Sequence, residues 1–310
     1  MFAESTAARI VPTMTHINRR NALQILGAGS LVAATPSIGF AAGKKMKLSI
    51  AAYSFRNHFG YMKGKERKAA EPKMNMRKFI DFCAANHAGA ELTSYFFPPK
   101  VDAKFCRGLR NYAKKKGVGI SGTAVGNNFS YEPEKDRKAQ MDYVKKWIDH
   151  AAQMGGPHVR IFAGKKRRET SEEKADKLVI EALQEACEYA GKKKVYLGLE
   201  NHDSISTAER LIRLIEAVDS KWLGVNLDSG NFRTADPYKD FELSAPYAVN
   251  VQLKADIRFP GKPAEPADLK RLMGLLKKAA YKGWVALEYE LNKDPYTSIP
   301  PIMKELAGML

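Results

Sequence analysis

Short apolar segments alternate with amphipathic ones from residue 47 to the end of the chain. The amphipathic segments, such as 76–88, 134–155 and 207–218, show the period of α-helices, and the apolar ones have the length of strands. The predicted strands are 47–53, 90–96, 118–124, 158–162, 195–200, 222–228, 249–254 and 284–289. Eight strands, each followed by a helix, predict an α/β protein built as a (β/α)8 barrel. No break in composition marks a second domain, so residues 44–310 are expected to form one barrel domain.

The first 43 residues carry a different pattern, which resembles a twin-arginine export signal. Arg19 and Arg20 precede an apolar run of small residues that ends in Ala-Ala-Gly. Asn18 and Ala22 depart from the usual motif, so an ordinary secretion signal or a membrane-anchored N-terminus stays open. We expect residues 1–43 to be an export signal peptide and the mature protein to be periplasmic or otherwise exported. No other run reaches the roughly 18 apolar residues of a spanning helix, so no stable membrane insertion is expected after cleavage.

The chain has a formal net charge of +17, which is compatible with binding to nucleic acid, to an anionic surface or to an acidic substrate. The lysines, however, gather in predicted helices, for example at 114–116 and 192–194, where a solvated helix face explains them. The three cysteines, Cys83, Cys106 and Cys187, also lie in helical patterns and show no CxxC spacing. We therefore expect reduced cysteines that pack in the core, without a disulfide framework.

Four successive predicted strands carry an oxygen-bearing side chain at or near their C-terminal ends: Glu200, Asp228, Gln252 and Glu288. Alternation along each strand places these side chains on one face, and in a barrel this face points inward near the C-terminal rim. Three carboxylates that meet there would repel one another and raise each other's pKa. A divalent metal ion resolves this conflict, and ligands that are all oxygen favour Mn²⁺ or Mg²⁺ over Zn²⁺. The residues therefore predict one divalent metal ion at this rim.

The mature chain resembles the sugar phosphate isomerase/epimerase family, the xylose isomerase-like TIM barrels that also include AP endonuclease 2-like proteins. The resemblance rests on the four strand-end positions and on Arg258, which stands six residues after Gln252. In that family a Glu, an Asp, a His and a Glu hold one metal ion, so the match implies a metal site at the same four positions. Gln252 stands where the family has His, and Asn231 stands where a second His is usual. The arginine binds substrate oxygen in those enzymes, which implies the same for Arg258.

The resemblance implies proton abstraction from a carbon next to a carbonyl, through an enediolate that the metal ion stabilises. Glu200 or Glu288 takes the proton and the partner returns it, so both are expected to be catalytic. The protein would then be a metal-dependent isomerase or epimerase of a small sugar or keto-sugar. Two alternatives stay open: a 3-keto-glycoside lyase or hydrolase that uses the same deprotonation, and a non-catalytic sugar-binding barrel. Nucleic acid is not an expected substrate, because phosphodiester cleavage in the related endonucleases uses several histidines.

Six further side chains are expected to bind the substrate: Glu91, Arg160, His202, Asn231, Lys254 and Arg258. For His202 the alternative is a loop cap, and for Arg160 it is a partner for a metal-site carboxylate. Lys254 either neutralises the enediolate or pairs with Glu91. Barrels of this kind occur in several oligomeric states, so a homo-oligomer stays open as well.

Overall fold

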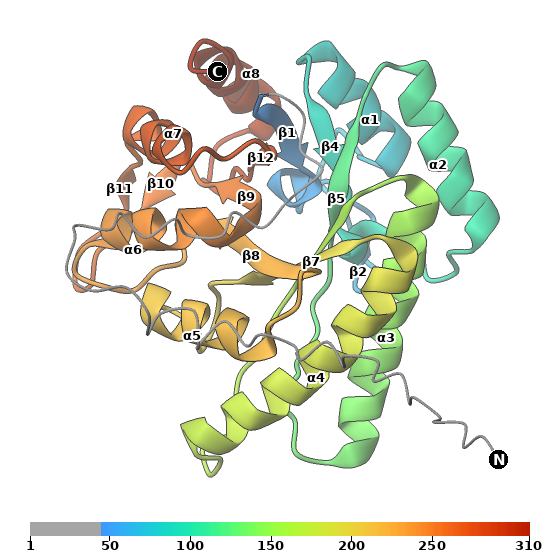
Figure 1. Ribbon diagram of the computed structural model, residues 1–310. Helices are drawn as coiled ribbons and strands as arrows, with labels where there is room; N and C mark the ends of the chain where they lie inside the picture. The colour runs from blue at the N-terminus through green and yellow to red at the C-terminus, as the bar shows by residue number, and fades with distance from the viewer. Residues whose placement is uncertain (1–44) are drawn as a thin grey trace, which may run out of the picture. The chain divides into compact units, whose positions relative to one another are not determined.

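The chain forms a closed barrel of parallel strands (Figure 1). This computed structural model describes residues 45–310, and the predicted export signal at 1–43 lies outside the described residues. The barrel strands are β1 (Lys47–Ala51), β4 (Gly89–Glu91), β5 (Ile120–Ala124), β6 (His158–Ile161), β7 (Tyr196–Glu200), β8 (Leu223–Asp228), β9 (Ala248–Leu253) and β12 (Trp284–Leu287). They are hydrogen-bonded in the order β1-β12-β9-β8-β7-β6-β5-β4, and β4 pairs with β1 to close the ring. The predicted (β/α)8 barrel is confirmed.

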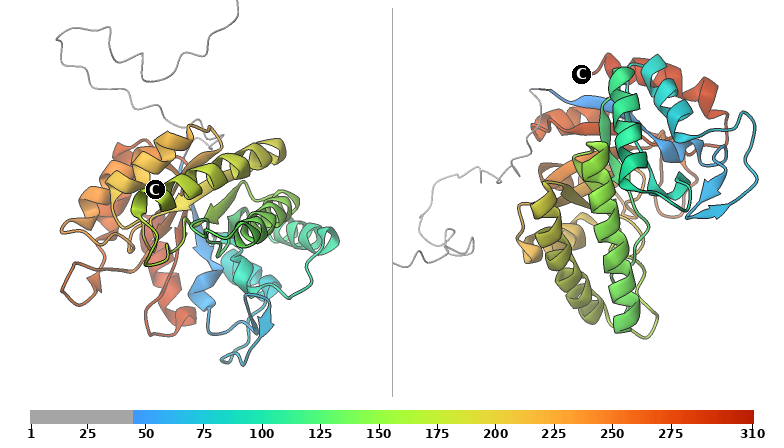
Figure 2. Two further views of the ribbon diagram at one scale, coloured as in Figure 1. Left: turned by 90° about the horizontal axis from the view of Figure 1, so that it is seen from below. Right: turned by 90° about the vertical axis from the view of Figure 1, so that its right-hand side faces the viewer.

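In the described part of the chain, α-helices follow the barrel strands and cover the outside of the barrel (Figure 2). They are α1 (Met76–Ala85), α2 (Ala103–Lys115), α3 (Glu134–Met154), α4 (Glu172–Lys193), α5 (Ala208–Val218), α6 (Pro237–Ser244), α7 (Leu269–Lys278) and α8 (Pro295–Ala307). Polar residues begin several of them: Asn75, Asp102 and Ser171 accept hydrogen bonds from backbone N–H groups of the first turn of α1, α2 and α4. These caps determine where the loops before α1, α2 and α4 end.

The predicted strand at 90–96 is the largest difference between expectation and structure. β4 ends at Glu91, and Ser94–Phe96 form the 3₁₀ helix η3. The backbone N–H of Phe96 donates to the Thr93 carbonyl, so the chain turns instead of extending the strand. The apolar run that suggested a longer strand is buried after this turn, because Phe96 and Phe97 are each 2% exposed.

The two longest loops after strands contain short hairpins. Between β1 and α1, β2 (Tyr61–Met62) pairs with β3 (Lys65–Glu66), and between β9 and α7, β10 (Asp256–Ile257) pairs with β11 (Glu265–Pro266). Both hairpins follow barrel strands and therefore belong to the rim at the C-terminal ends of the strands.

The two faces of each barrel strand differ in polarity. Outward-facing residues such as Leu199, Val225 and Leu253 are 0% exposed and belong to the apolar core between the strands and the helices. Polar side chains alternate with them and face the barrel interior. The core therefore surrounds the barrel, and the polar interior is free to carry chemistry.

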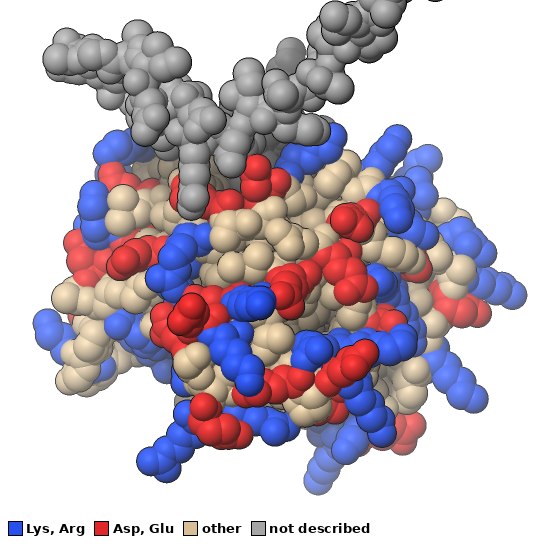
Figure 3. Space-filling view, turned by 60° about the horizontal axis from the view of Figure 1, so that its bottom comes forward, with Lys and Arg blue, Asp and Glu red and all other residues tan. Residues whose placement is uncertain are grey.

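The cysteines and the lysine runs lie where the sequence predicts them. All three cysteines are buried and free. The lysine runs at 114–116 and 192–194 are exposed on helix ends. Basic and acidic side chains are interspersed on the face shown in Figure 3. Among residues 45–310, no helix has the length and apolar character needed to cross a membrane.

Below the rim, glycines make room for the buried ring of His158. A Cβ added at Gly198 would lie 2.4 Å from Nε2 of this ring, and one added at Gly122 would lie 2.9 Å from Nδ1. Burial, with the charge of Arg160, lowers the pKa of His158 to about 3, so the ring is neutral at physiological pH. The interior at this level is filled to contact distance.

We predict that Gly198→Ala destabilises the barrel by about 1–3 kcal/mol, the usual cost of overpacking. Besides His158, the new methyl group would meet Asn226 Cβ at 2.9 Å and its backbone N at 3.1 Å, and a strand backbone cannot move aside cheaply. Denaturant-induced unfolding measures the change. Gly274→Ala in α7 is the matched control, because no atom lies within 4 Å of its added Cβ. This variant should be as stable as the wild type or more so, and equal stabilities of the two variants would contradict the prediction.

Candidate active site

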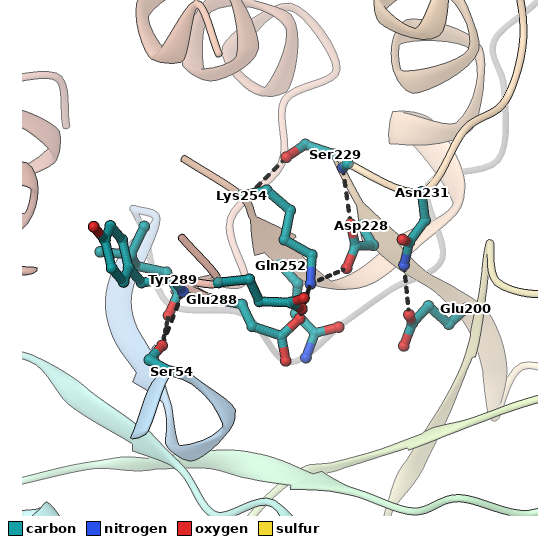
Figure 4. Close-up of polar contacts among 12 residues, drawn as sticks. Ser54, Glu200, Asp228, Ser229, Asn231, Gln252, Lys254, Glu288 and Tyr289 are labelled. Carbon is teal, nitrogen blue, oxygen red and sulfur yellow. Dashed lines mark hydrogen bonds and ion pairs between the residues drawn. The ribbon is translucent and has the colours of Figure 1, made fainter. Parts of the chain in front are cut away.

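Four barrel strands bring the predicted site residues to one end of the barrel interior (Figure 4). Asp228 is paired in register with Gln252, and Glu200 with Asn226. Glu288 follows β12, where its backbone N–H donates to the Leu253 carbonyl at 2.8 Å. The side chains of Glu200, Asp228, Gln252 and Glu288 are all buried. The expectation that they converge on the interior holds.

Glu200 is held by one cation and two amides, of which Asn226 Nδ2 makes the longer hydrogen bond, 3.5 Å to Oε2. Its Oε2 lies 3.0 Å from Arg160 Nε, and its Oε1 accepts a hydrogen bond of 3.0 Å from Asn231 Nδ2. Burial raises the pKa of Glu200 to about 7, although the charge of Arg160 opposes this rise. A carboxyl group with this pKa can both accept and release a proton near neutral pH. Arg160 thus takes the carboxylate-partner role that was one of its two predicted interpretations.

Lys254 lies among three other carboxylates. Its ammonium group is 3.2 Å from Asp228 Oδ2 and donates hydrogen bonds to Glu288 Oε2 and Glu290 Oε1. Burial alone would lower the pKa of Lys254, but these charges raise it well above its ordinary value, so the group stays protonated. The same ammonium group outweighs burial at Glu290 and lowers its pKa. Lys254 does not pair with Glu91, which was the other interpretation of its position.

A layer of amide side chains lies beside these charges and binds Glu91. Gln252 Nε2 and Asn250 Nδ2 donate to the two carboxylate oxygens of Glu91, at 2.7 and 3.1 Å. Gln252 Oε1 in turn accepts a hydrogen bond of 2.7 Å from Asn226 Nδ2. Burial, with the charge of Glu288, raises the pKa of Glu91 to about 7. Glu91 was predicted to bind substrate, but in the structure both of its oxygens are occupied by amides.

The arrangement differs from a metal-ligand sphere. Among residues 45–310, no group of three or more His, Cys, Asp or Glu side chains is placed to hold a metal ion. An ion that bridged Asp228 and Glu288 would lie beside the ammonium group of Lys254, and like charges at such distances repel strongly. The carbonyl oxygen of Gln252 already accepts from Asn226. The side chains as arranged do not fit the Mn²⁺ or Mg²⁺ ion that the sequence predicts.

An aromatic ring packs against Arg160, the cation that pairs with Glu200. The guanidinium of Arg160 lies 4.0 Å from the ring centroid of Phe162, and His202 stacks on the same ring at 4.4 Å. Within the described residues, Arg160 Nη1 is buried and has no hydrogen-bond partner. His202 Nδ1 lies 3.1 Å from Asp203 Oδ2, and burial lowers the pKa of His202. Arg160 therefore has a donor left for a ligand, and His202 lies near it on the partly exposed rim.

Arg258 lies outside the buried cluster. Its side chain is 60% exposed and 3.6 Å from Asp256 Oδ2, because the β10–β11 hairpin carries it away from the barrel. Its charge still reaches Glu290 and contributes to the lowered pKa there. The predicted role in substrate binding is not supported by the present position of Arg258.

Three residues of the site, Asn226, Asn250 and Glu290, were not predicted as site residues. Glu290 shares the inward parity of Glu288, but the predicted strand stopped before it. Asn226 and Asn250 share the parity of Asp228 and Gln252, so the alternation that identified the charged residues could have identified these amides as well.

Solved structures of several barrels share this fold. An L-ribulose 3-epimerase is 16% identical with a TM-score of 0.67, and the match covers 85% of this chain and 94% of that one. The 3-keto-D-glucoside 4-epimerase of E. coli is 16% identical with a TM-score of 0.63, covering 86% of this chain and 99% of that one. An IOLI protein with a bound zinc atom is 15% identical with a TM-score of 0.67, covering 85% and 96%. At such identities the likeness establishes the fold.

A search of curated protein sequences finds no match to this chain. The family model described as xylose isomerase-like TIM barrel matches residues 45–309, which is nearly the whole described region. The chain therefore belongs to the family of xylose isomerase-like TIM barrels.

Proposed function

We propose that this protein is a sugar isomerase or epimerase that removes a proton from a carbon next to a carbonyl group. The observation that carries the proposal is the pair Glu200 and Glu288. These two buried glutamates come from different barrel strands and lie to either side of Gln252 in Figure 4. Each has its own cation, Arg160 for Glu200 and Lys254 for Glu288. Two separately supported carboxyl groups suit a reaction in which one takes a proton and the other returns it.

The two glutamates are assigned different steps of the reaction. Glu200, with a pKa of about 7, accepts the proton, and Asn231 and Arg160 hold its carboxylate in place. The unpartnered Nη1 of Arg160 is available to a hydroxyl or carbonyl oxygen of the substrate. Glu288 then takes up a proton from solvent and returns it to the carbon or to the oxygen of the enediolate, while Glu200 releases the abstracted proton to solvent. The charge of the enediolate is stabilised by cations fixed in the site before the reaction begins.

The substrate class is inferred from the neighbours in structure. Their printed descriptions include an L-ribulose 3-epimerase, a D-psicose 3-epimerase and a 3-keto-D-glucoside 4-epimerase. We take a small sugar or keto-sugar as the substrate and do not include nucleic acid.

The predicted Mn²⁺ or Mg²⁺ ion is left out of the reaction, because Lys254 and Arg160 already face the carboxylates. Export to the periplasm, or elsewhere outside the cytoplasm, stays part of the proposal on the strength of residues 1–43.

The direct test is proton NMR of the protein in D₂O with ketoses, aldoses and 3-keto-glucosides. Deuterium incorporated next to the carbonyl, with the rest of the sugar retained, is the expected result. An unsaturated product with release of the group at C1 would instead indicate the lyase. Binding of a sugar without any exchange would indicate a non-catalytic barrel and overturn the proposal.

Glu200→Gln and Glu288→Gln should each lower the exchange rate by about 10²–10⁴-fold, the usual contribution of a general acid or base. Glutamine keeps the size of the side chain and its hydrogen-bonding oxygen but cannot accept the proton. The control is Glu216→Gln on α5, a glutamate that accepts a hydrogen bond from Tyr247 far from the rim. Thermal unfolding of all three variants checks the fold. Full activity in either site variant would rule out the assigned pair.

The exchange rate should depend on pH through Glu200. The base must be ionised, so the rate should rise about tenfold per pH unit below the pKa of about 7 and level off above it. Arg160→Gln removes the charge that opposes this raised pKa and should move the midpoint to higher pH. Initial rates in buffers from about pH 3.5 to about pH 9 measure both curves. A wild-type midpoint near 4.5, the ordinary value for a glutamate, would show that Glu200 is not the base.

A further inference from the structure

We propose that Lys254 is a catalytic residue whose ammonium group supplies the positive charge for which the sequence predicts a divalent metal ion. The inference rests on the proposed function, because it concerns the charge that forms when the sugar loses a proton. It differs from the expectation for the family in one respect that can be measured. The cation is part of the chain, so the reaction needs no bound metal.

The first argument is the position of the ammonium group. Two of the predicted metal ligands, Asp228 and Glu288, both contact Lys254 Nζ, and Glu290 adds a third carboxylate. The side chain of Lys254 is 9% exposed, and that of Asp228 is 0% exposed. An ammonium group surrounded by three carboxylates in a buried site meets the same electrostatic need as a divalent ion.

The second argument is that neighbouring residues make room for this lysine. A Cβ added at Gly230 would lie 2.5 Å from Lys254 Cγ and 3.1 Å from its Cβ, so the stem passes where only glycine leaves space. Ser229 Oγ accepts a hydrogen bond of 2.9 Å from the backbone N–H of Lys254. The loop after β8 thus supports the position of Lys254 independently of the carboxylates.

In the reaction, the C–H electron pair moves toward the carbonyl oxygen while the proton passes to a glutamate. The oxygen then carries negative charge, and Lys254 stabilises it without giving up its own proton. In the free protein the ammonium group donates hydrogen bonds to Glu288 and Glu290, and Asp228 Oδ2 lies 3.2 Å away as an ion-pair partner that accepts no hydrogen bond from it. The side chain of Glu290 is 34% exposed on the rim, whereas those of Asp228 and Glu288 are buried. A substrate oxygen that takes the place of Glu290 would receive its hydrogen bond.

A Schiff base is not part of this proposal. Nucleophilic attack on a carbonyl requires the neutral amine. Three carboxylates lie within ion-pair distance of Lys254 Nζ and favour its ammonium form. The lysine therefore acts through its charge and its hydrogen bond.

The first experiment uses the wild-type protein after exhaustive dialysis against a chelator. Titration with Mn²⁺, followed by the electron paramagnetic resonance signal of the free ion, should show no stoichiometric binding. The rate of deuterium exchange should change by less than about twofold after chelation, a difference too small for loss of a catalytic charge. One bound Mn²⁺ per chain, with exchange that disappears on chelation, would overturn the proposal.

The second experiment replaces the charge. Lys254→Met keeps the stem but should lower exchange by about 10²–10³-fold, as when one stabilising donor is removed. This variant should also bind Mn²⁺, because three carboxylates lose their cation. Lys165→Met is the matched control, since Lys165 pairs with Asp203 at 3.3 Å but is 78% exposed. It should keep wild-type exchange and gain no metal binding. Unchanged exchange in Lys254→Met would contradict the proposal.

Gly230→Ala covers the case in which Lys254→Met does not fold. It displaces the lysine stem but keeps the charge, so exchange should fall while Arg160 and Glu200 stay in place.

Failure of the proposed function would give a different set of results from failure of the role of Lys254. If no sugar shows exchange in any variant, the isomerase is ruled out. The Mn²⁺ titrations of wild type and Lys254→Met then still decide whether the lysine holds the cation position.

Discussion

A carboxylate buried inside a protein needs a partner. At the C-terminal end of this barrel, cationic and amide side chains of the chain itself are the partners of the buried carboxylates. Arg160 faces Glu200, and Lys254 is shared by Asp228, Glu288 and Glu290. Amides serve the remaining carboxyl group, that of Glu91. Removal of any one partner would leave a buried charge uncompensated, which is usually costly. The charges of the site and the integrity of the barrel interior therefore depend on each other.

Much of this site follows from local rules that can be read along the sequence. Alternation on a strand determines which side chains face inward, and this correctly identified Glu200, Asp228, Gln252 and Glu288. The pairing among inward groups could not be read in this way. It depends on the register between strands and on side-chain direction, which take Gln252 toward Glu91 and Lys254 toward the rim. The spacing of six residues to Arg258 carried no information on the hairpin that moves it outward.

The metal ion was predicted from the carboxylates alone, without the cationic side chains that lie beside them in the folded barrel. Three carboxylates at strand ends call for a cation, and that reasoning holds in the structure. Arg160 and Lys254 were predicted to bind substrate, with pairing to a carboxylate as the alternative, and their charges were not counted in the balance that led to the metal ion. Their positions at 3.0 Å from Glu200 and 3.2 Å from Asp228 make them counterions. Proximity in the folded barrel, which the sequence does not report, decides between the two interpretations.

The tether between Lys254 and the backbone has a consequence for how the protein acquires its active state. A bound ion must be found, loaded and retained, and it can be lost to dilution or to a stronger ligand. A cation attached to β9 through its own side chain arrives when the barrel closes and cannot dissociate. Its local concentration is set by the fold, with Gly230 leaving the space for its stem. The fraction of protein molecules with an active site is then independent of the concentration of free metal ions in the surroundings.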